Sequence, residues 1–276
     1  MRRETYWEKA LEQTNLSINR NGLYPLETKV VTGEFYDKND FIIRKLDTSK
    51  FKKLICYGPK QNPFRPWEKI LEIDKIGKYH QLILNKYPVQ KGHILLITNS
   101  WKPQNGWLDI NDWVAIQKVN KDTSGLWFFN SSPIAGASQP HRHIQLLRRS
   151  HGEISCPREK WFLNLEISND NETKLKKSIV VSQFNFLEDS SYIYNLYLEL
   201  TKKIGLGDPV NDEKPRYPYN ILITNNWIAI IRRKFDHLHG FSINGLGFAG
   251  YLLITNKSDI NYLKNYGPEK LLENFV

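Results

Sequence analysis

Short apolar runs recur along the chain, and most of them have the length of a β-strand. Runs of four to six apolar or alternating residues, bounded by residues that favour turns, are typical of strands. We predict strands over residues 41–46, 79–84, 93–97, 126–129, 144–147, 219–224 and 227–231. The last two are joined by Asn225-Asn226, which predicts a β-hairpin.

Other segments carry apolar residues three or four positions apart, which is the spacing of an amphipathic helix. We predict helices over 5–18, from a cap at Asp109 or Asn111 through Gln117, from a cap at Asp189 or Ser190 to Ile204, and twice near the C-terminus, the second opening at Pro268. Together these elements favour an α+β fold. We expect an antiparallel sheet with helices packed to one side and the C-terminal hairpin extending the sheet.

Composition and charge narrow the class of function. No apolar run reaches the roughly 18 residues of a membrane span, and the first residues lack the apolar segment of a secretory signal. Two cysteines without a CxxC spacing support neither a disulfide scaffold nor a thiolate zinc site, so we expect a cytoplasmic protein. The net charge of +10 favours anionic ligands. Because the Lys and Arg residues are scattered, a small polyanion is expected rather than nucleic acid.

The clearest functional signal lies between two predicted strands. The strand at 126–129 is followed by a loop of small residues, which leads through His141 and His143 into the strand at 144–147. Because side chains alternate between the faces of a strand, His141, His143 and Gln145 share one face. Packing alone does not require such a row of two imidazoles and an amide.

Three interpretations of this polar row compete. In the first, the row is a set of hydrogen-bonded side chains at a sheet edge. In the second, it is half of a metal site that His237 and His239 complete. In the third, it is a catalytic site for phosphoryl chemistry. The metal interpretation is weakened because Gln145 is a poor metal ligand and no carboxylate lies close to the first histidine pair in sequence. We therefore predict no protein-bound metal.

Every group that covalent catalysis on a phosphate requires lies in this stretch. A neutral imidazole can attack phosphorus and later depart, provided that an acceptor holds its other nitrogen and fixes the tautomer. Fixed donors must meet the charge on the phosphoryl group, and the loop amides, Ser138 and the Gln145 amide can supply them. The concentration of these groups in one short stretch favours the catalytic interpretation.

Residues 136–145, Gly-Ala-Ser-Gln-Pro-His-Arg-His-Ile-Gln, resemble the His-x-His-x-Gln motif of the diadenosine tetraphosphate (Ap4A) phosphorylases, also called ATP adenylyltransferases, of the histidine-triad superfamily. Residues 85–89 with 92–96, 219–227 and 243–250 are similar to further parts of that family. The resemblance implies a histidine-triad-like antiparallel sheet with flanking helices and a uridylyltransferase-like architecture. It also implies an N-terminal histidine-triad-like part over 1–166 and a C-terminal ATP adenylyltransferase part over 180–276.

The resemblance implies a nucleotidyltransferase that converts Ap4A and phosphate to ATP and ADP through an adenylylated histidine. The nucleophile would be His143, with Gln145 on the transferred phosphate and His141 lining the site and orienting His143. The residues that the resemblance places on the substrate are Lys53, Asn85, Lys86, Asn130, Gly136, Ala137, Ser138, Gln139, Asn244 and Gly247.

Several alternatives stay open at this point. Hexose-1-phosphate uridylyltransferases share the general architecture, although Arg142 here replaces the proline of their His-Pro-His-x-Gln strand. A dinucleoside polyphosphate hydrolase and a nucleotide-binding sensor without turnover are the other candidates. No organic cofactor is expected. A Mg²⁺ ion accompanying the nucleotide, adenylyl sulfate as a second adenylyl donor and the oligomeric state are left open.

Overall fold

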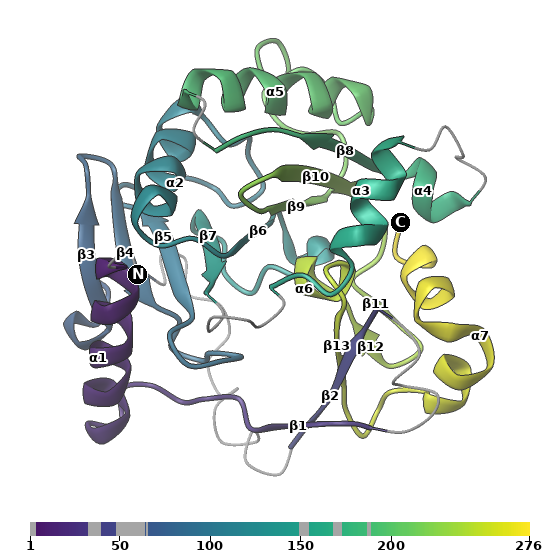
Figure 1. Cartoon of the computed structure of the whole chain (residues 1–276), viewed down its shortest axis with the longest axis horizontal. Coiled ribbons are helices and arrows are strands. Elements are labelled where there is room, and N and C mark those ends of the chain that lie inside the picture. The colour runs from purple at the N-terminus through teal and green to yellow at the C-terminus, as the bar shows by residue number, and fades with distance from the viewer. Residues whose placement is uncertain are drawn as a thin grey trace.

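The computed structural model describes residues 4–32, 40–47, 64, 66–148, 155–167, 173–186 and 189–276. Its main strands are β3 (Glu72–Ile76), β4 (His80–Leu84), β5 (Ile94–Thr98), β6 (Leu126–Asn130), β7 (His143–Leu147), β8 (Ile179–Gln183), β9 (Tyr219–Ile223) and β10 (Trp227–Arg232). They form one eight-stranded sheet in the order β3-β4-β5-β7-β6-β9-β10-β8 (Figure 1). Every neighbouring pair in it is antiparallel.

The strand that carries the histidine motif lies in the middle of this sheet. β7 pairs with β5 on one side and with β6 on the other. β6 in turn pairs with β9, so the N-terminal and C-terminal halves of the chain share one sheet. The hairpin of β9 and β10 therefore extends the sheet as predicted.

Helices cover both faces of the sheet. One face packs on α1 (Thr5–Asn19), α2 (Ile110–Asp122) and α5 (Ser190–Lys203), and the other on α3 (Glu159–Ile167), α4 (Lys174–Lys177), α6 (Gly245–Phe248) and α7 (Ile260–Glu273) (Figure 1). The prediction of a single covered face was wrong because the central strands are apolar on both sides. In β6, Trp127 and Phe129 enter one core, while Leu126 and Phe128 enter the other.

A smaller sheet joins segments from the two ends of the chain. It consists of β1 (Thr28–Val30), β2 (Ile42–Leu46) and β13 (Tyr251–Ile254), and β2 runs parallel to β13. Two further short strands, β11 (His237–Leu238) and β12 (Phe241–Ser242), pair with each other. The small sheet brings residues near 44 beside residues near 252, and together they frame a cavity.

The helix ends follow local sequence signals. Asp109 caps α2 by accepting from the Asn111 N–H at 3.0 Å, and Asp112 accepts from the Asp109 N–H at 2.9 Å. α7 is broken at Gly267, which has a φ of 81° immediately before Pro268. This break agrees with the two C-terminal helices predicted from the sequence.

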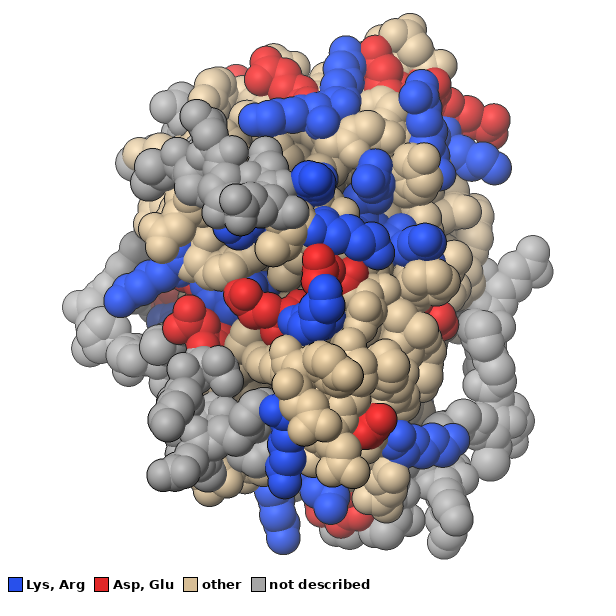
Figure 2. Space-filling view, turned by 90° about the vertical axis from the view of Figure 1, so that its right-hand side faces the viewer, with Lys and Arg blue, Asp and Glu red and all other residues tan. Residues whose placement is uncertain are grey.

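Charges of both signs are interspersed on the surface. Figure 2 shows one face of the molecule, on which Lys and Arg side chains lie among Asp and Glu. This agrees with the scattered basic residues of the sequence. Within the described ranges, no helix combines the length and the apolar character needed to cross a membrane.

Candidate active site

The face of β7 that carries His143 and Gln145 opens on a cavity of about 280 Å³. Ligand sites commonly measure roughly 300–1,000 Å³, so this one suits a single nucleotide-sized group better than a whole dinucleotide. Six of the site residues predicted from the sequence line this cavity: Asn85, Lys86, Ser138, Gln139, His143 and Gln145. Its apolar lining includes Phe64, Trp67, Leu71, Ile83 and Leu95.

His143 is held as a neutral imidazole with one nitrogen fixed. Its Nδ1 lies 2.8 Å from the carbonyl oxygen of His141. Because a carbonyl can only accept, Nδ1–H donates and Nε2 keeps its lone pair. Burial lowers the pKa of His143 to about 4, against the opposing effect of that hydrogen bond. The side chain therefore has the charge state and tautomer that a nucleophile requires at pH 7.

His141 contributes its backbone carbonyl, while its side chain is fully buried. The His141 Nε2 lies 2.9 Å from both the hydroxyl and the carbonyl oxygen of Thr98. The ring also contacts Phe64 and Trp101 edge-on. The backbone carbonyl of His141 contacts His143 Nδ1, which fits the predicted orienting role. The His141 side chain was also predicted to line the site, but among the described residues it does not line the cavity.

Gln145 lies near a pair of polar side chains, Asn85 and His93. The Tyr87 N–H donates to Asn85 Oδ1 at 2.9 Å, and Asn85 Nδ2 donates to His93 Nδ1 at 3.3 Å. Burial lowers the pKa of His93 to about 3, and hydrogen bonding with Gln145 opposes this shift. Neutral His93 then carries its proton on Nε2, which makes no hydrogen bond of standard geometry within the described residues. If the oxygen of the Gln145 amide faces this proton, the NH₂ group of Gln145 remains able to donate to a ligand.

The loop between β6 and β7 is shaped by its own hydrogen bonds. A 3-10 turn covers Pro133–Ala135, and Gly136 follows with a φ of 90°. The N–H groups of Gly136 and Ala137 donate to carbonyls earlier in the loop, so these amides hold its shape. Ser138 and Gln139 are the loop residues that line the cavity.

Asn130 lies at the end of β6, behind this loop. Its amide oxygen accepts from Asn220 Nδ2 at 2.8 Å and from the Gly245 N–H at 3.0 Å. Asn220 is fixed in turn by the buried Arg233, which donates to its amide oxygen at 2.7 Å. The Asn130 Nδ2 is buried and has no hydrogen-bond partner among the described residues. A buried donor of this kind is costly unless it meets an acceptor. Asn130, which was predicted to bind substrate, lines neither the His143 cavity nor the cavity beside the small sheet.

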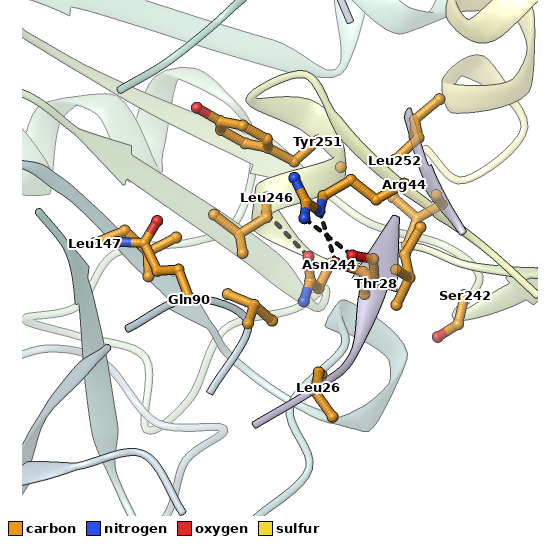
Figure 3. A pocket seen from close by; sticks show the side chains of 14 residues that line it. Leu26, Thr28, Arg44, Gln90, Leu147, Ser242, Asn244, Leu246, Tyr251 and Leu252 are labelled. Carbon is orange, nitrogen blue, oxygen red and sulfur yellow. Dashed lines mark hydrogen bonds between the residues drawn. The ribbon is translucent and has the colours of Figure 1, made fainter. Parts of the chain in front are cut away.

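Asn244 and Gly247 line a second cavity, of about 220 Å³, framed by the small sheet (Figure 3). Asn244 packs against the loop: a Cβ on Gly136 would lie 2.4 Å from the Asn244 Cβ, which explains the glycine. Arg44 of β2 also lines this cavity and donates to the hydroxyl and carbonyl oxygens of Thr28, at 2.6 and 3.2 Å (Figure 3). The predicted substrate residues are therefore divided between two neighbouring cavities.

Lys86 is paired with Glu68, and both line the His143 cavity. Their side chains are 34% and 48% exposed, so solvent screens the pair. Glu68 was not predicted, because nothing in its local sequence marks it. Arg44 was not predicted either, although Lys53, the predicted basic residue nearest to it in sequence, is only nine positions away.

The remaining predictions concern Lys53 and a metal site. Lys53 lies outside the described residues. Over the described ranges, no group of three or more His, Cys, Asp or Glu side chains is arranged to hold a metal ion. His237 and His239 are exposed, and the His239 ring stacks on Tyr262 with centroids 3.8 Å apart.

Comparisons with known proteins identify the family. Residues 1–160 match the family model described as the Ap4A phosphorylase N-terminal domain, and residues 157–276 match the ATP adenylyltransferase C-terminal domain. The chain belongs to the Ap4A phosphorylase family. Membership in this family confirms the predicted family and the prediction of a nucleotidyltransferase.

Two curated relatives come from Saccharomyces cerevisiae. Diadenosine 5',5'''-P1,P4-tetraphosphate phosphorylase 2 is 24% identical over 245 residues, covering 79% of this chain and 75% of the relative. Protein APA1 is 24% identical over 217 residues, covering 70% of this chain and 68% of the relative.

Solved structures share the fold. The yeast Ap4A phosphorylase Apa2 in complex with Ap4A aligns over 100% of this chain and 97% of its own, with a TM-score of 0.73 and 18% identity. Its complex with AMP aligns over 99% and 98%, with a TM-score of 0.73 and 20% identity. The predicted α+β fold class is thereby confirmed.

Proposed function

We propose that this protein phosphorolyses Ap4A in the cytoplasm, converting Ap4A and phosphate to ATP and ADP through an adenylyl-histidine intermediate on His143. The observation that carries the proposal is the neutral His143, whose Nδ1–H donates to the His141 carbonyl and whose Nε2 is left as the nucleophilic atom. The yeast comparisons support the substrate, because a relative is named as an Ap4A phosphorylase and a structure of yeast Ap4A phosphorylase Apa2 was solved with Ap4A bound.

The reaction proceeds in two displacements at the same phosphorus. In the first, His143 Nε2 forms a bond to the α-phosphorus of one adenosine, the bridging P–O bond breaks, and ATP departs. In the second, an oxygen of phosphate attacks that phosphorus, the N–P bond breaks, and ADP leaves. Gln145 and Ser138 supply fixed donors for the charge that develops on the phosphoryl oxygens. A Mg²⁺ ion on the polyphosphate would neutralise part of the same charge.

The two cavities fit a substrate with two nucleoside ends. The His143 cavity receives the adenosine that is transferred, with Asn85 and Lys86 on its sugar and phosphate. The second cavity receives the departing nucleotide, with Asn244 and Arg44 as its polar contacts. The loop at Gly136 lies against Asn244, so the polyphosphate chain crosses between the cavities along this loop, beside Ser138 and Gln139.

Transfer to phosphate rather than to water follows from the chemistry of Gln145. A neutral amide cannot act as a general base for water, whereas a phosphate held by the loop donors and nearby cations is positioned for attack. A hydrolase is therefore the weaker candidate. Adenylyl sulfate contains the same adenylyl group and is a further donor to test.

One assay tests the proposal. The pure protein is incubated with Ap4A, with and without phosphate, and the nucleotides are separated. We expect ATP and ADP with phosphate present and very slow AMP formation without it. Rapid AMP release regardless of phosphate would show a hydrolase, and tight binding of Ap4A without products would show a sensor. Gln145→His should raise the ratio of hydrolysis to phosphorolysis even if the overall rate falls.

A further inference from the structure

The hydrogen-bond ladder between β6 and β7 ends before it reaches the nucleophile. The last cross-strand pair joins Phe128 to Gln145, and the strands then separate to admit the loop that follows Asn130. A central strand that loses its partner would leave unpaired peptide groups in a buried region, which is costly. In this protein the gap is bridged by the side chain of Gln104, which comes from the connection between β5 and α2 and is 3% exposed.

Both ends of the Gln104 amide are engaged. Its Oε1 accepts from the His143 N–H at 2.8 Å, and its Nε2 donates to the Asn130 carbonyl at 2.7 Å and to the His143 carbonyl at 3.1 Å. Since the N–H can only donate and the carbonyls can only accept, the orientation of the amide is fixed. The side chain therefore takes the place of a strand, satisfying His143 and Asn130 at once.

The backbone around Gln104 holds the same end of the motif. The Gln104 N–H donates to the Pro140 carbonyl at 2.8 Å, and the Arg142 N–H donates to the Lys102 carbonyl at 2.9 Å. Pro103 forms an isolated bridge with His141. Residues 102–104 thus replace β6 as the neighbour of the chain where it enters β7.

We infer that Gln104 is a positioning residue for catalysis, setting the peptide of His143 against the end of β6 and hence Nε2 against the phosphate loop. Its side chain does not line the His143 cavity, so it acts without contacting the substrate. The inference rests on the proposed function. A displacement of about 1 Å at a reacting atom can cost roughly 100-fold in rate, which sets the size of the expected effect.

The first test is Gln104→Met, which keeps the length of the side chain and removes all three hydrogen bonds. We expect kcat to fall about 100-fold, with KM for Ap4A within about threefold of wild type, because only the aim of the nucleophile changes. Single-turnover labelling of His143 by Ap4A should slow by the same factor. The matched control is Gln117→Met, a buried glutamine on α2, which should keep the wild-type kcat.

The second test is Gln104→Glu, read as a pH profile. The carboxylate can still accept from the His143 N–H but faces two carbonyl oxygens, and protonation restores one donor. A buried glutamate can have a pKa near 8–9, so the ratio of variant to wild-type kcat should rise as the pH is lowered from about 8 to 6. The same ratio for Gln104→Met should be flat.

The outcomes separate positioning from a structural role. A kcat within about threefold of wild type in folded Gln104→Met overturns the inference, and so does a raised KM with unchanged kcat. If Gln104→Met does not fold, a flat Gln104→Glu ratio overturns it. Absence of turnover in the wild type would refute the proposed function instead. The inference is then decided by ¹⁵N NMR of His143, which should show a single Nδ1–H tautomer in the wild type and a mixture in Gln104→Met or Gln104→Glu. A single tautomer in the folded variants would refute it.

Discussion

The two faces of β7 serve different purposes although their residues alternate in sequence. On one face His143 and Gln145 line the cavity, and His143 Nε2 is left without a proton. On the side of the other face, Arg142, which immediately precedes β7, donates to Asp112 of α2 at 2.9 Å, and Asp112 also lies 2.8 Å from His80 Nε2. Burial alone would raise the Asp112 pKa, but the hydrogen bond from His80 and the charge of Arg142 hold that pKa below its usual value. One face provides the reactive groups, and the other ties the strand to the core.

We expect substitutions on the two sides of β7 to affect different properties. Changes on the cavity face should reduce turnover and leave the free energy of unfolding nearly unchanged. Changes on the Arg142 face should do the reverse, because the groups there have buried partners that would be left unpaired.

The largest effect is expected from His143→Ala. Loss of the only group proposed to bond covalently to substrate should reduce turnover by at least about 10⁴-fold. The free energy of unfolding should change little, since the ring borders a cavity and its removal opens no closed core void. Label from adenosine-labelled Ap4A should remain on the wild-type protein. Label or turnover retained by the variant would exclude His143 as the nucleophile.

Arg142→Met should mainly affect stability. Asp112 is fully buried, and removing one partner of a buried pair typically costs about 3–5 kcal/mol. We expect a loss of this size in urea unfolding, with the kcat of the folded protein, measured at low temperature, within about tenfold of wild type. The double variant Arg142→Met/Asp112→Asn should recover part of the loss, because it removes the unpaired charge. A single variant as stable as the wild type would contradict the anchoring role of this face.

Acid should lower the free energy of unfolding, because His143 and His93 are buried as neutral side chains. Unfolded histidines titrate near pH 6.5, whereas burial lowers the folded pKa of His143 to about 4 and that of His93 to about 3. The unfolded state therefore binds more protons below pH 6.5, so stability is fully present above that pH and falls as the pH decreases. The contribution of each histidine should be about half of 1.4 kcal/mol per pH unit at pH 6.5 and should approach about 1.4 kcal/mol per pH unit near pH 5. The free energy of unfolding, measured with urea at several pH values, should fall less steeply with decreasing pH in His143→Ala than in the wild type, by the contribution of one histidine. Equal pH dependence in the two proteins would show that His143 is not buried in its neutral form.

Local patterns predicted the parts of the site that depend on neighbouring residues. Strand alternation placed His143 and Gln145 on one face, and capping chemistry placed the start of α2 at Asp109 or Asn111, of which Asp109 is the cap. The helix α3 was missed because its apolar residues, among them Trp161 and Phe162, are too continuous to show a helical period.

Contacts between distant residues could not be predicted in this way. Gln104 is 39 positions from His143, and Asn220 is 90 positions from Asn130. Nothing local distinguishes these amides from surface glutamines and asparagines. Their roles follow only from the strand order, which brings the two halves of the chain into one sheet.

The smallest effect concerns charge at the cavity, where Lys86 and Glu68 form a partly exposed pair. If Lys86 meets a substrate phosphate, Lys86→Ala should raise KM for Ap4A by about fivefold, or roughly 1 kcal/mol, with a smaller change in kcat. Glu68 competes with the phosphate for the same ammonium, so Glu68→Gln should lower KM. Both effects should shrink as salt is raised, because partly exposed charges are screened over about 8–10 Å. A KM that rises in both variants would mean that the intact ion pair shapes the cavity. A KM unchanged in both would place Lys86 among the many surface cations that do not contact the substrate.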